Sequence, residues 1–384
     1  MLLRSTVIFS LACVATARKC SDIIVDVALA SRNAVFDLDP LETDEQVTSF
    51  YLGLSRSGNN YTEELLKGAE LQWQNVQGRY KLATTYCEPD SGPGRAIQIM
   101  THGIGFDRSY WDIPYPYDDH SYVARAVDQH GYSTLTWDRL GVGASSHIAD
   151  TVNELQIFLE IQALRTLSDL ARQGRLGGAA QHAYSKVVHV GHSFGSFMTY
   201  SLVNQYPNIS QGVILTGFTQ VPNYQGLFVL GANFVTADSA SLASGLSYPA
   251  GYIGSGSKTG IQTSFFSPDD LDTDLLDLAY HRAQPHTAGE ILTVSSGGGV
   301  TNVFAGPVMI LTGRYDVPFC GGDCTVTTAI GDAAPNLLAA SAVMFPKASV
   351  FNATMPSKAG HGINYGKSHD ESYDAMLGFF DSNV

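Results

Sequence analysis

The chain has 384 residues, of which 44% are hydrophobic and 15% are charged. This composition can bury a large core and excludes an intrinsically disordered protein. Acidic residues number 36 against 22 basic residues, which gives a formal charge of −14. A chain this acidic is repelled by nucleic acid and by anionic membrane surfaces, so we expect neither as a partner.

The first 17 residues have the pattern of a signal peptide. Arg4 supplies a positive charge, residues 5–14 form a short apolar stretch, and Ala15-Thr16-Ala17 provides small residues before a cleavage site. The apolar stretch is too short to cross a bilayer as a helix. The alternative is a buried N-terminal strand or helix. We expect secretion, either to the cell exterior or to the lumen of the secretory pathway, without stable membrane insertion.

Four cysteines remain after the predicted signal: Cys20, Cys87, Cys320 and Cys324. An even number in an exported chain indicates two disulfides, although four cysteines allow three pairings. Cys320 and Cys324 bracket the flexible tripeptide Gly-Gly-Asp, which favours the pair Cys320–Cys324 and, by default, Cys20–Cys87. The alternative is a metal site, but no second Cys/His pair lies beside this spacing. We therefore predict no metal.

Three sequons for N-linked glycosylation also fit export. They begin at Asn60, Asn208 and Asn352. Each pattern is short and common by chance, but together with a signal peptide they favour a eukaryotic secretory route and a glycoprotein.

The predicted elements alternate between strand and helix over most of the chain. Residues 18–95 are less regular and fit antiparallel edge strands that precede a parallel core. In chain order, strands are predicted at 96–100, 132–137, 186–190, 212–216, 307–312 and 349–354, and helices at 121–129, 153–173, 193–206 and 370–380. Such alternation predicts an α/β fold with a parallel sheet and helices on both faces.

The alternation of strands and helices stops between residues 218 and 300. This stretch is rich in Gly, Ser and aromatic residues and has one predicted helix at 269–282. More than 70 residues is long for surface loops, so this stretch is interpreted as a cap over the end of the sheet. The predicted organisation is a signal peptide at 1–17, core parts at 18–217 and 301–384, and the cap at 218–300.

A candidate nucleophile lies between a strand and a helix. Gly191-His192-Ser193-Phe194-Gly195 follows the strand 186–190 and opens the helix 193–206. Gly-x-Ser-x-Gly at a strand-to-helix turn is a nucleophile elbow, in which the tight turn leaves no room for a Cβ at either glycine. The bland alternative is a small-residue turn where a strand and a helix cross closely. We predict Ser193 as the nucleophile.

A serine hydroxyl needs a base, and the base needs a carboxylate that orients it. Asp316 follows the predicted strand 307–312 and is favoured as the acid over Asp138 and Asp323. Beyond it in the chain only His361 and His369 remain as histidines. His361 lies between two glycines and is predicted as the base, whereas His369 is interpreted as an exposed residue at the start of the last helix.

The oxyanion of an acyl-transfer reaction needs backbone N–H donors. One is expected from Phe194, the residue after the nucleophile. The second is expected from the turn after the strand 96–100, where Ile104 is the candidate and Gly103 the neighbouring possibility. His102 is predicted to hydrogen-bond this loop.

These pieces resemble the esterase/lipase branch of the α/β-hydrolase superfamily. The resemblance rests on His102-Gly103, the segment Asp138 to Ser145, the elbow, Gly313 to Asp316, and Gly360-His361, and it covers roughly residues 95 to 380. It implies a mostly parallel eight-stranded sheet and a Ser–Asp–His triad in that chain order. It also implies that Asp138 and Arg139 belong to a structural loop without a catalytic role.

The resulting hypothesis is a secreted serine hydrolase that cleaves a small or medium apolar carboxylic ester through an acyl-enzyme, with no cofactor. The predicted partner is thus a small-molecule ester, and no oligomeric state is predicted. A lactonase, thioesterase, peptidase or tailoring enzyme of secondary metabolism could carry the same triad. A non-enzymatic binding protein on this scaffold is a third hypothesis, although such proteins usually lose one member of the triad.

Overall fold

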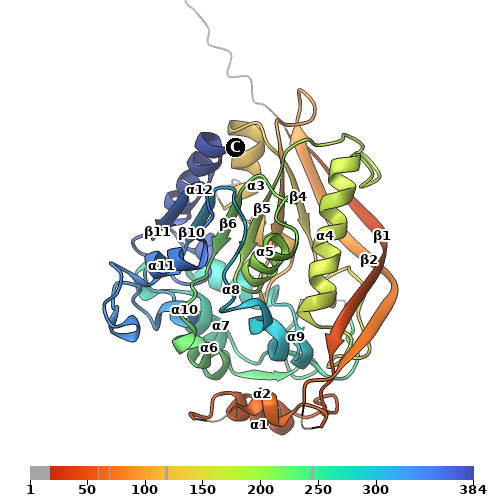
Figure 1. Ribbon diagram of the computed structural model, residues 1–384, viewed down its shortest axis with the longest axis vertical. Coiled ribbons are helices and arrows are strands. Elements are labelled where there is room, and N and C mark those ends of the chain that lie inside the picture. The colour runs from red at the N-terminus through yellow and green to blue at the C-terminus, as the bar shows by residue number, and fades with distance from the viewer. Residues whose placement is uncertain (1–17, 59, 69, 117–119, 244–245) are drawn as a thin grey trace, which may run out of the picture.

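A computed structural model of the chain describes residues 18–58, 60–68, 70–116, 120–243 and 246–384 (Figure 1). The signal peptide predicted at 1–17 lies outside the described residues. The main sheet has eight strands, in the spatial order β1-β2-β4-β3-β5-β6-β10-β11. They are β1 (Arg18–Ala34), β2 (Trp73–Pro89), β3 (Ile97–Thr101), β4 (Ser133–Trp137), β5 (Val187–His192), β6 (Val213–Thr216), β10 (Val308–Leu311) and β11 (Phe351–Thr354).

Helices cover both faces of this sheet. Helices α4 and α5 lie on one face, and α3 and α12 lie on the other (Figure 1). The α-helices outside the cap are α1 (Asp44–Leu54), α2 (Tyr61–Glu64), α3 (Tyr122–Ala124), α4 (Ile157–Gln173), α5 (Phe194–Gln205), α10 (Val317–Cys320), α11 (Leu337–Ala340) and α12 (His369–Asn383). Short 3-10 turns are η1 (Arg108–Trp111), η4 (Pro222–Tyr224), η5 (Pro268–Asp270), η6 (Val294–Gly297), η7 (Thr328–Ile330), η8 (Ser341–Met344) and η9 (Ile363–Tyr365), and η3 (Arg125–Gln129) is a π-turn.

The sheet divides the apolar interior into two cores. Successive side chains of a strand point to opposite faces, so Val213 and Leu215 join the core beneath α4 and α5, while Ile214 joins the core beneath α12. Both faces are covered, and all four residues of β6 are therefore buried. The predicted α/β fold with a mostly parallel eight-stranded sheet is confirmed.

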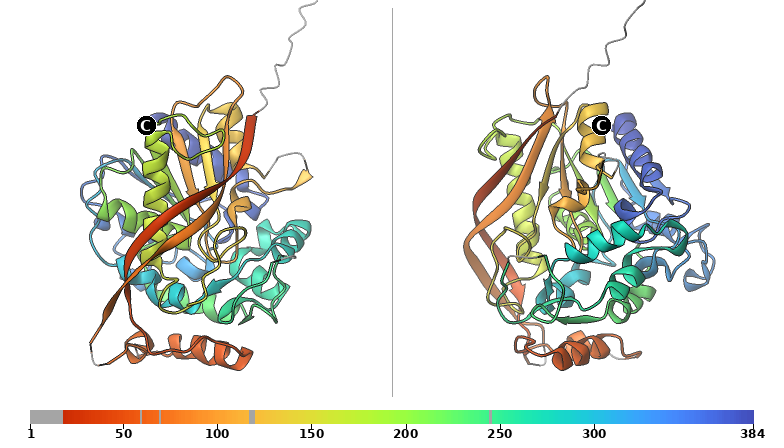
Figure 2. Two further views of the ribbon diagram at one scale, coloured as in Figure 1. Left: turned by 90° about the vertical axis from the view of Figure 1, so that its right-hand side faces the viewer. Right: turned by 180° about the vertical axis from the view of Figure 1, so that it is seen from behind.

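The two edge strands are antiparallel, as expected for residues 18–95. β1 pairs with β2 from Arg18↔Pro89 to Ala34↔Trp73, and β2 pairs antiparallel with β4. Cys20 and Cys87 lie opposite each other near the open end of this hairpin and form a disulfide. The hairpin crosses the sheet diagonally and carries the chain to α1 and α2 beyond the cap (Figure 2).

The segment predicted as a cap lies over the carboxyl ends of the parallel strands. It contains more helices and strands than the single predicted helix. The others were not predicted because they are too short to show a clear periodicity in the sequence. A three-stranded antiparallel sheet in the order β7-β8-β9 joins four short helices. These elements are α6 (Gln225–Gly231), β7 (Phe234–Thr236), β8 (Tyr252–Ser255), α7 (Lys258–Phe265), α8 (Thr273–His281), β9 (His286–Thr287) and α9 (Ala288–Thr293).

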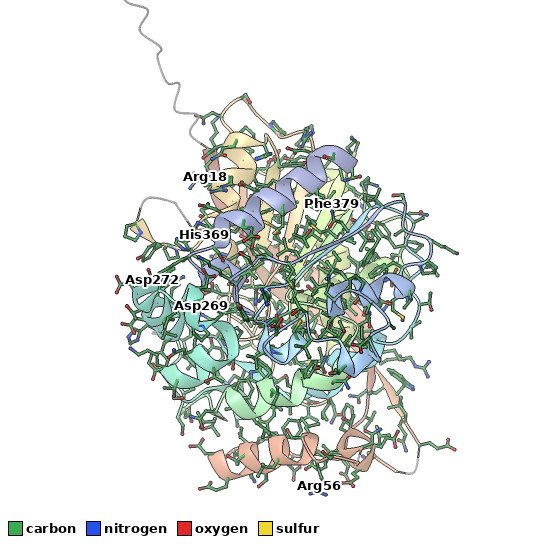
Figure 3. The ribbon with its side chains drawn as sticks, turned by 90° about the vertical axis from the view of Figure 1, so that its left-hand side faces the viewer. Arg18, Arg56, Asp269, Asp272, His369 and Phe379 are labelled. Carbon is green, nitrogen blue, oxygen red and sulfur yellow. A yellow bond between two sulfur atoms is a disulfide. The ribbon has the colours of Figure 1, made fainter. Side chains whose placement is uncertain are left out.

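Two local predictions were wrong. The helix predicted at 153–173 begins only at Ile157. The side chain of Gln156 accepts a hydrogen bond from Ala34 N and donates one to Ala34 O, which ties the residue before the helix to the end of β1. His369, the first residue of α12 (Figure 3), is buried rather than exposed. The centroid of its ring lies 3.8 Å from that of the His120 ring. In the part of the chain that the structure describes, no helix is long and apolar enough to cross a membrane.

Candidate active site

Ser193 lies at the sharp turn between β5 and α5. Its φ of 54° and ψ of −116° place it in a conformation that L-residues rarely adopt. The strain is held by backbone bonds on both sides: Ser193 N donates to Thr216 O at 2.9 Å, and Ser193 O accepts from Ser196 N at 2.8 Å. Backbone strain that the surrounding structure enforces is typical of functional turns.

The glycines of the elbow are required by close backbone contacts. A Cβ at Gly191 would lie 2.4 Å from Gly195 O, and a Cβ at Gly195 would lie 2.3 Å from Thr101 O. These distances are far inside van der Waals contact. The turn therefore packs against its own backbone and against the end of β3, as the sequence pattern predicted.

The structure brings Ser193, His361 and Asp316 together from three separate loops. His361 Nε2 lies 2.9 Å from Ser193 Oγ, and His361 Nδ1 lies 2.6 Å from Asp316 Oδ2. A carboxylate only accepts hydrogen bonds, so Nδ1 carries the ring proton and leaves Nε2 as acceptor for the serine hydroxyl. His361 and Asp316 are almost completely buried, whereas Ser193 is partly accessible.

The carboxylate of Asp316 is held by both of its oxygens. Its Oδ1 accepts from Phe319 N at 2.7 Å and caps the N-terminus of α10, while Oδ2 binds the imidazole. The loop of Asp316 reaches that of His361 because Gly313 lies against it, where a Cβ would be 2.2 Å from Gly360 O. A side chain at Gly313 would separate the acid from the base.

Three aromatic rings enclose His361. Phe265 and Phe319 stack on it at 5.7 Å and 5.5 Å between centroids, and Phe228 approaches by its edge at 6.3 Å. Phe228 and Phe265 belong to the cap, so the cap and α10 together hold the imidazole in place and exclude water from it.

The two predicted oxyanion donors, Phe194 and Ile104, belong to two different segments that reach the cavity of Ser193. Phe194 is the first residue of α5, so its N–H has no acceptor within the helix. Ile104 lies in the turn after β3, and both residues line the same cavity as Ser193. The turn approaches the nucleophile closely, because a Cβ at Gly103 would lie 2.8 Å from Ser193 Cβ.

Two further histidines lie behind the site and are buried. His102 Nδ1 lies 2.8 Å from Gly103 O, and His102 Nε2 accepts from Arg139 N at 3.1 Å, so His102 ties its loop to the neighbouring one as expected. Burial, and secondarily the positive Arg139, lowers the pKa of His102 well below its usual range. Burial likewise lowers the pKa of His192, helped by His361. Both rings are therefore neutral at physiological pH.

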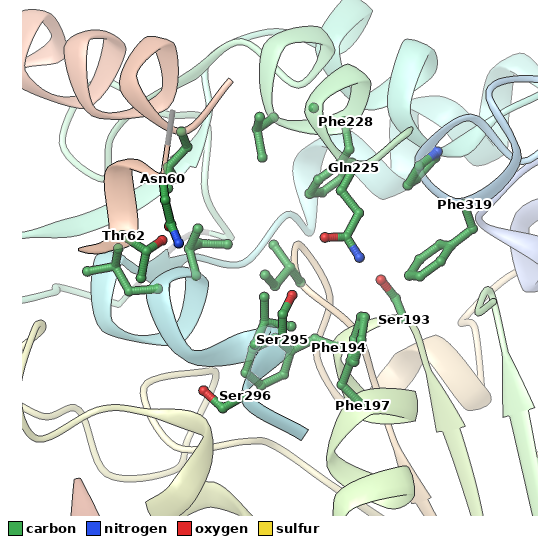
Figure 4. A pocket seen from close by; sticks show the side chains of 18 residues that line it. Asn60, Thr62, Ser193, Phe194, Phe197, Gln225, Phe228, Ser295, Ser296 and Phe319 are labelled. Carbon is green, nitrogen blue, oxygen red and sulfur yellow. The ribbon is translucent and has the colours of Figure 1, made fainter. Parts of the chain in front are cut away.

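A cavity of about 450 Å³ opens above Ser193. Near the nucleophile its wall is apolar apart from Gln225, whose amide faces Ser193 from the cap (Figure 4). The lining side chains include Leu54, Asn60, Thr62, Ile104, Ser193, Phe194, Phe197, Gln225, Phe228, Val229, Ile291, Leu292, Val294, Ser295, Ser296, Pro318 and Phe319. The first three come from the connection between β1 and β2, which sequence reasoning did not assign to the site.

A buried ion cluster joins the cap to the core behind this cavity. Arg139 Nη1 binds Glu160 Oε1 of α4 at 2.8 Å and Glu290 Oε1 of α9 at 2.5 Å, and all three side chains are inaccessible. The Arg139 guanidinium also lies 4.4 Å from the centroid of Phe194. The sequence placed Arg139 in a structural loop, but it gave no signal for partners that lie 21 and 151 positions away.

The remaining predicted residues are placed as follows. Cys320 and Cys324 form a disulfide directly after Asp316. Asn60, Asn208 and Asn352 are all exposed. Among the described residues, no group of three or more His, Cys, Asp or Glu side chains could hold a metal ion.

The mostly parallel sheet, the strained serine at its carboxyl edge and the adjoining His and Asp define the α/β-hydrolase class of proteins. The chain belongs to the alpha/beta hydrolase family, whose sequence model matches residues 98–374. A search of curated proteins gave no match.

Solved structures agree with this fold. One is an esterase from Thermogutta terrifontis, with 14% identity, a TM-score of 0.52, and alignment over 79% of this chain and 94% of that one. Another is an alpha/beta hydrolase fold protein from Chitinophaga pinensis, with 15% identity, a TM-score of 0.50 and the same coverage. Identities this low establish the shared fold alone.

Proposed function

We propose that this protein is a secreted serine hydrolase that cleaves carboxylic esters through an acyl-enzyme. The observation that carries the proposal is the unbroken chain of contacts from Ser193 Oγ to His361 and from His361 to Asp316. A non-enzymatic binding protein would not need this alignment or a strained serine. The esterase activity named for the Thermogutta structure agrees with the proposal.

In the acylation step, Ser193 Oγ attacks the ester carbonyl carbon while His361 Nε2 takes the hydroxyl proton. The carbonyl oxygen becomes an oxyanion, which accepts hydrogen bonds from the N–H groups of Phe194 and Ile104. Asp316 stabilises the imidazolium that forms. His361 then gives the proton to the departing alcohol oxygen, and the C–O bond breaks to leave Ser193 acylated.

In the deacylation step, water takes the place of the alcohol. His361 removes a proton from the water as its oxygen attacks the acyl carbon, and the same two N–H groups stabilise the second oxyanion. Collapse breaks the bond to Ser193 Oγ, which recovers its proton from His361. The acid leaves, and no metal or organic cofactor takes part in the proposed sequence.

The apolar wall near Ser193 favours an apolar group beside the scissile bond. Phe194, Phe197 and Phe319 lie near Ser193 (Figure 4), and Ile104 lines the same cavity. A volume of about 450 Å³ fits small to medium ligands. The proposed substrate is therefore a small or medium, largely apolar ester.

Secretion is supported by features outside the site. The two disulfides are stable in oxidising compartments, and the three sequon asparagines are accessible for glycosylation. Peptide sequencing of the N-terminus of the protein recovered from a eukaryotic host medium tests cleavage after residue 17. Intact mass before and after glycosidase treatment tests the three sites.

The proposed chemistry is tested with the Ser193→Ala variant and a matched panel of ester, thioester, lactone and amide substrates. We expect the wild type to prefer esters. We also expect the variant to lose about 10⁶-fold in kcat, because removal of a triad nucleophile has this effect in other hydrolases. Ester hydrolysis that persists in the variant would contradict the proposal, and a preference for another bond would redirect it to that bond.

A further inference from the structure

The connection between β1 and β2 leaves the sheet and covers the cap. The described residues of this connection, 35–58, 60–68 and 70–72, depart from the sheet beyond the pair Ala34↔Trp73 and contribute α1 and α2. Both helices lie beyond the cap, at the end of the molecule opposite the C-terminus (Figure 1). We call residues 35–72 the outer segment.

Hydrogen bonds attach the outer segment to the cap. Tyr51 of α1 shares a short buried hydrogen bond with His286 Nε2 of β9. Burial lowers the pKa of His286 to about 3, so its ring is neutral and the contact is not an ion pair. Asp44 Oδ1 accepts from both Thr236 N at 2.9 Å and Thr236 Oγ1 at 2.8 Å.

A shared apolar core completes the attachment. Phe50 and Tyr51 are buried together with Phe234 and Ile253 of the cap, and the rings of Tyr51 and Phe234 lie 4.9 Å apart. Buried aromatic side chains contribute strongly to the stability of a packed interface. The outer segment is therefore a fixed part of the cap.

The outer segment forms the wall of the cavity far from the nucleophile. Leu54, at the end of α1, and Asn60 and Thr62, at the start of α2, line the cavity that also contains Ser193. Asn60 and Thr62 lie across the cavity from Ser193 (Figure 4). A substrate chain that extends from the scissile bond through the apolar part of the cavity must meet this wall.

The cavity wall is electrically neutral. No side chain of Asp, Glu, Lys or Arg is among the described residues that line it, although the whole chain has a formal charge of −14. An ionised group that entered this cavity would lose its hydration without gaining a counter-charge. The lining therefore selects against substrates with a charged tail.

We propose that the outer segment is a second cap that selects neutral esters by length, and that Leu54 sets the longest chain that fits. The proposal rests on the proposed esterase function. It adds the residue that limits chain length and a charge rule, by which the neutral cavity wall disfavours substrates with a charged tail. In this proposal Leu54 is a specificity-determining residue, since it lines the cavity from the outer segment and is not one of the reacting groups.

The test compares Leu54→Trp and Leu54→Ala with the wild type on two series of esters. One series lengthens the acyl chain of nitrophenyl esters from acetate to decanoate, and the other lengthens the alcohol of acetate esters. For Leu54→Trp we expect kcat/KM to fall by about tenfold or more on long members of at least one series, with acetate unchanged. Leu54→Ala should shift the optimum toward longer chains. The matched control is Leu52→Trp, because Leu52 lies on the same helix and is 56% exposed.

The charge rule is tested with a long ester that ends in a carboxylate, against its methyl-ester analogue. We expect a tenfold or larger preference for the neutral compound. Normal, Ser193-dependent hydrolysis of acetate by all variants, with both length profiles unchanged, would overturn the proposal while leaving the esterase function intact. Equal turnover of the charged and neutral long esters would overturn the charge rule. Loss of the esterase function itself would appear differently, as a wild type that does not hydrolyse acetate.

Discussion

At the scale of single residues, the site requires glycine at positions where a side chain would collide with the nucleophile. Gly103 lets the turn after β3 approach Ser193 closely, and this turn carries Ile104, the proposed second oxyanion donor. A Cβ there would lie 2.8 Å from Ser193 Cβ and 3.2 Å from His192 O. The substitution would push the turn, and with it the proposed oxyanion donor, away from the nucleophile.

We therefore predict that Gly103→Ala lowers kcat by about a hundredfold, as loss of an oxyanion donor does, with a smaller change in KM. Steady-state kinetics on a short nitrophenyl ester measure both constants. Gly378→Ala is the matched control, because no atom lies within 4 Å of a Cβ at that position of α12. Near-normal kcat in Gly103→Ala would remove Ile104 from the proposed mechanism.

The buried His189 lies outside the proposed triad and is expected to affect stability. His189 on β5 lies between Ser168 Oγ at 2.8 Å and Ser210 Oγ at 3.0 Å. Burial, with a smaller effect of the nearby Arg172, lowers its pKa from 6.5 to about 3. Between these two pH values the unfolded chain binds a proton that the folded protein does not. The stability due to neutral His189 is therefore complete above pH 6.5 and is lost as the pH falls toward 3.

This difference predicts a slope that can be measured. Between pH 6 and pH 4, the free energy of unfolding of His189→Asn should fall less steeply than that of the wild type, by about 1.4 kcal/mol per pH unit. Urea titrations at several pH values give both slopes. His182→Asn serves as the control, because His182 is exposed. Identical slopes for His189→Asn and the wild type would mean that His189 is protonated in the folded protein.

At the scale of elements, the cap is held by charge as well as by apolar packing. Arg139 follows β4, Glu160 lies on α4 and Glu290 lies on α9. The single guanidinium of Arg139 binds both buried carboxylates and so links these three elements. Burial raises the pKa of Glu160 well above its usual range, the positive Arg139 opposes this effect, and Glu290 adds to it. The cluster therefore places one guanidinium between two buried carboxylates, and Glu160 is the carboxyl whose protonated form burial favours.

Two substitutions separate these roles. Glu160→Gln replaces a carboxyl whose pKa is raised by a neutral amide of similar shape, and it should change the free energy of unfolding by less than about 1 kcal/mol at pH 7. Arg139→Met removes the partner of a buried charge and should cost about 3–5 kcal/mol. Chemical denaturation at pH 7 compares them. A cost for Glu160→Gln as large as that for Arg139→Met would show that Glu160 is ionised.

The elements differ in how well the sequence predicted them, and length explains most of the difference. The strands of the parallel core are fully buried runs of mainly apolar or β-branched residues, and the predicted ranges differ from β3 to β6 by only one or two residues. The strands of the cap have only two to four residues each, which is too short for an alternating pattern. The start of α4 was missed because Gln156 bonds to a strand more than 120 positions earlier.

The site shows the same contrast. Ser193 could be found because its environment is local: a strand, two glycines and a helix that follow one another directly in the sequence. Asp316 and His361 could be placed as the acid and base expected after the later strands, and the structure puts both within hydrogen-bond distance in one chain of contacts. The outer segment could not be assigned to the cavity, because only tertiary packing through Tyr51 and His286 brings it there.

At the scale of the whole molecule, the two disulfides close loops of very different length. Cys20 and Cys87 are 67 positions apart and hold the hairpin that carries the outer segment, whereas Cys320 and Cys324 are 4 apart. A cross-link that closes a longer loop removes more entropy from the unfolded chain. The first disulfide should therefore stabilise the protein more than the second.

We predict that Cys20→Ser/Cys87→Ser lowers the free energy of unfolding by about 4 kcal/mol, and that Cys320→Ser/Cys324→Ser lowers it by about 2 kcal/mol. Denaturation by urea under non-reducing conditions measures both. A larger loss for the second pair would mean that the loop after Asp316, and not chain entropy, dominates the effect of that disulfide.

The central claim is that Ser193 is a nucleophile activated by His361. The most direct measurement is the reaction of the folded protein with a fluorophosphonate probe, followed by mass spectrometry of the labelled peptide. We predict one adduct per chain at Ser193, a rate at least a hundredfold lower in His361→Ala, and no adduct in Ser193→Ala. An unlabelled wild type, or a label at another serine, would contradict the account.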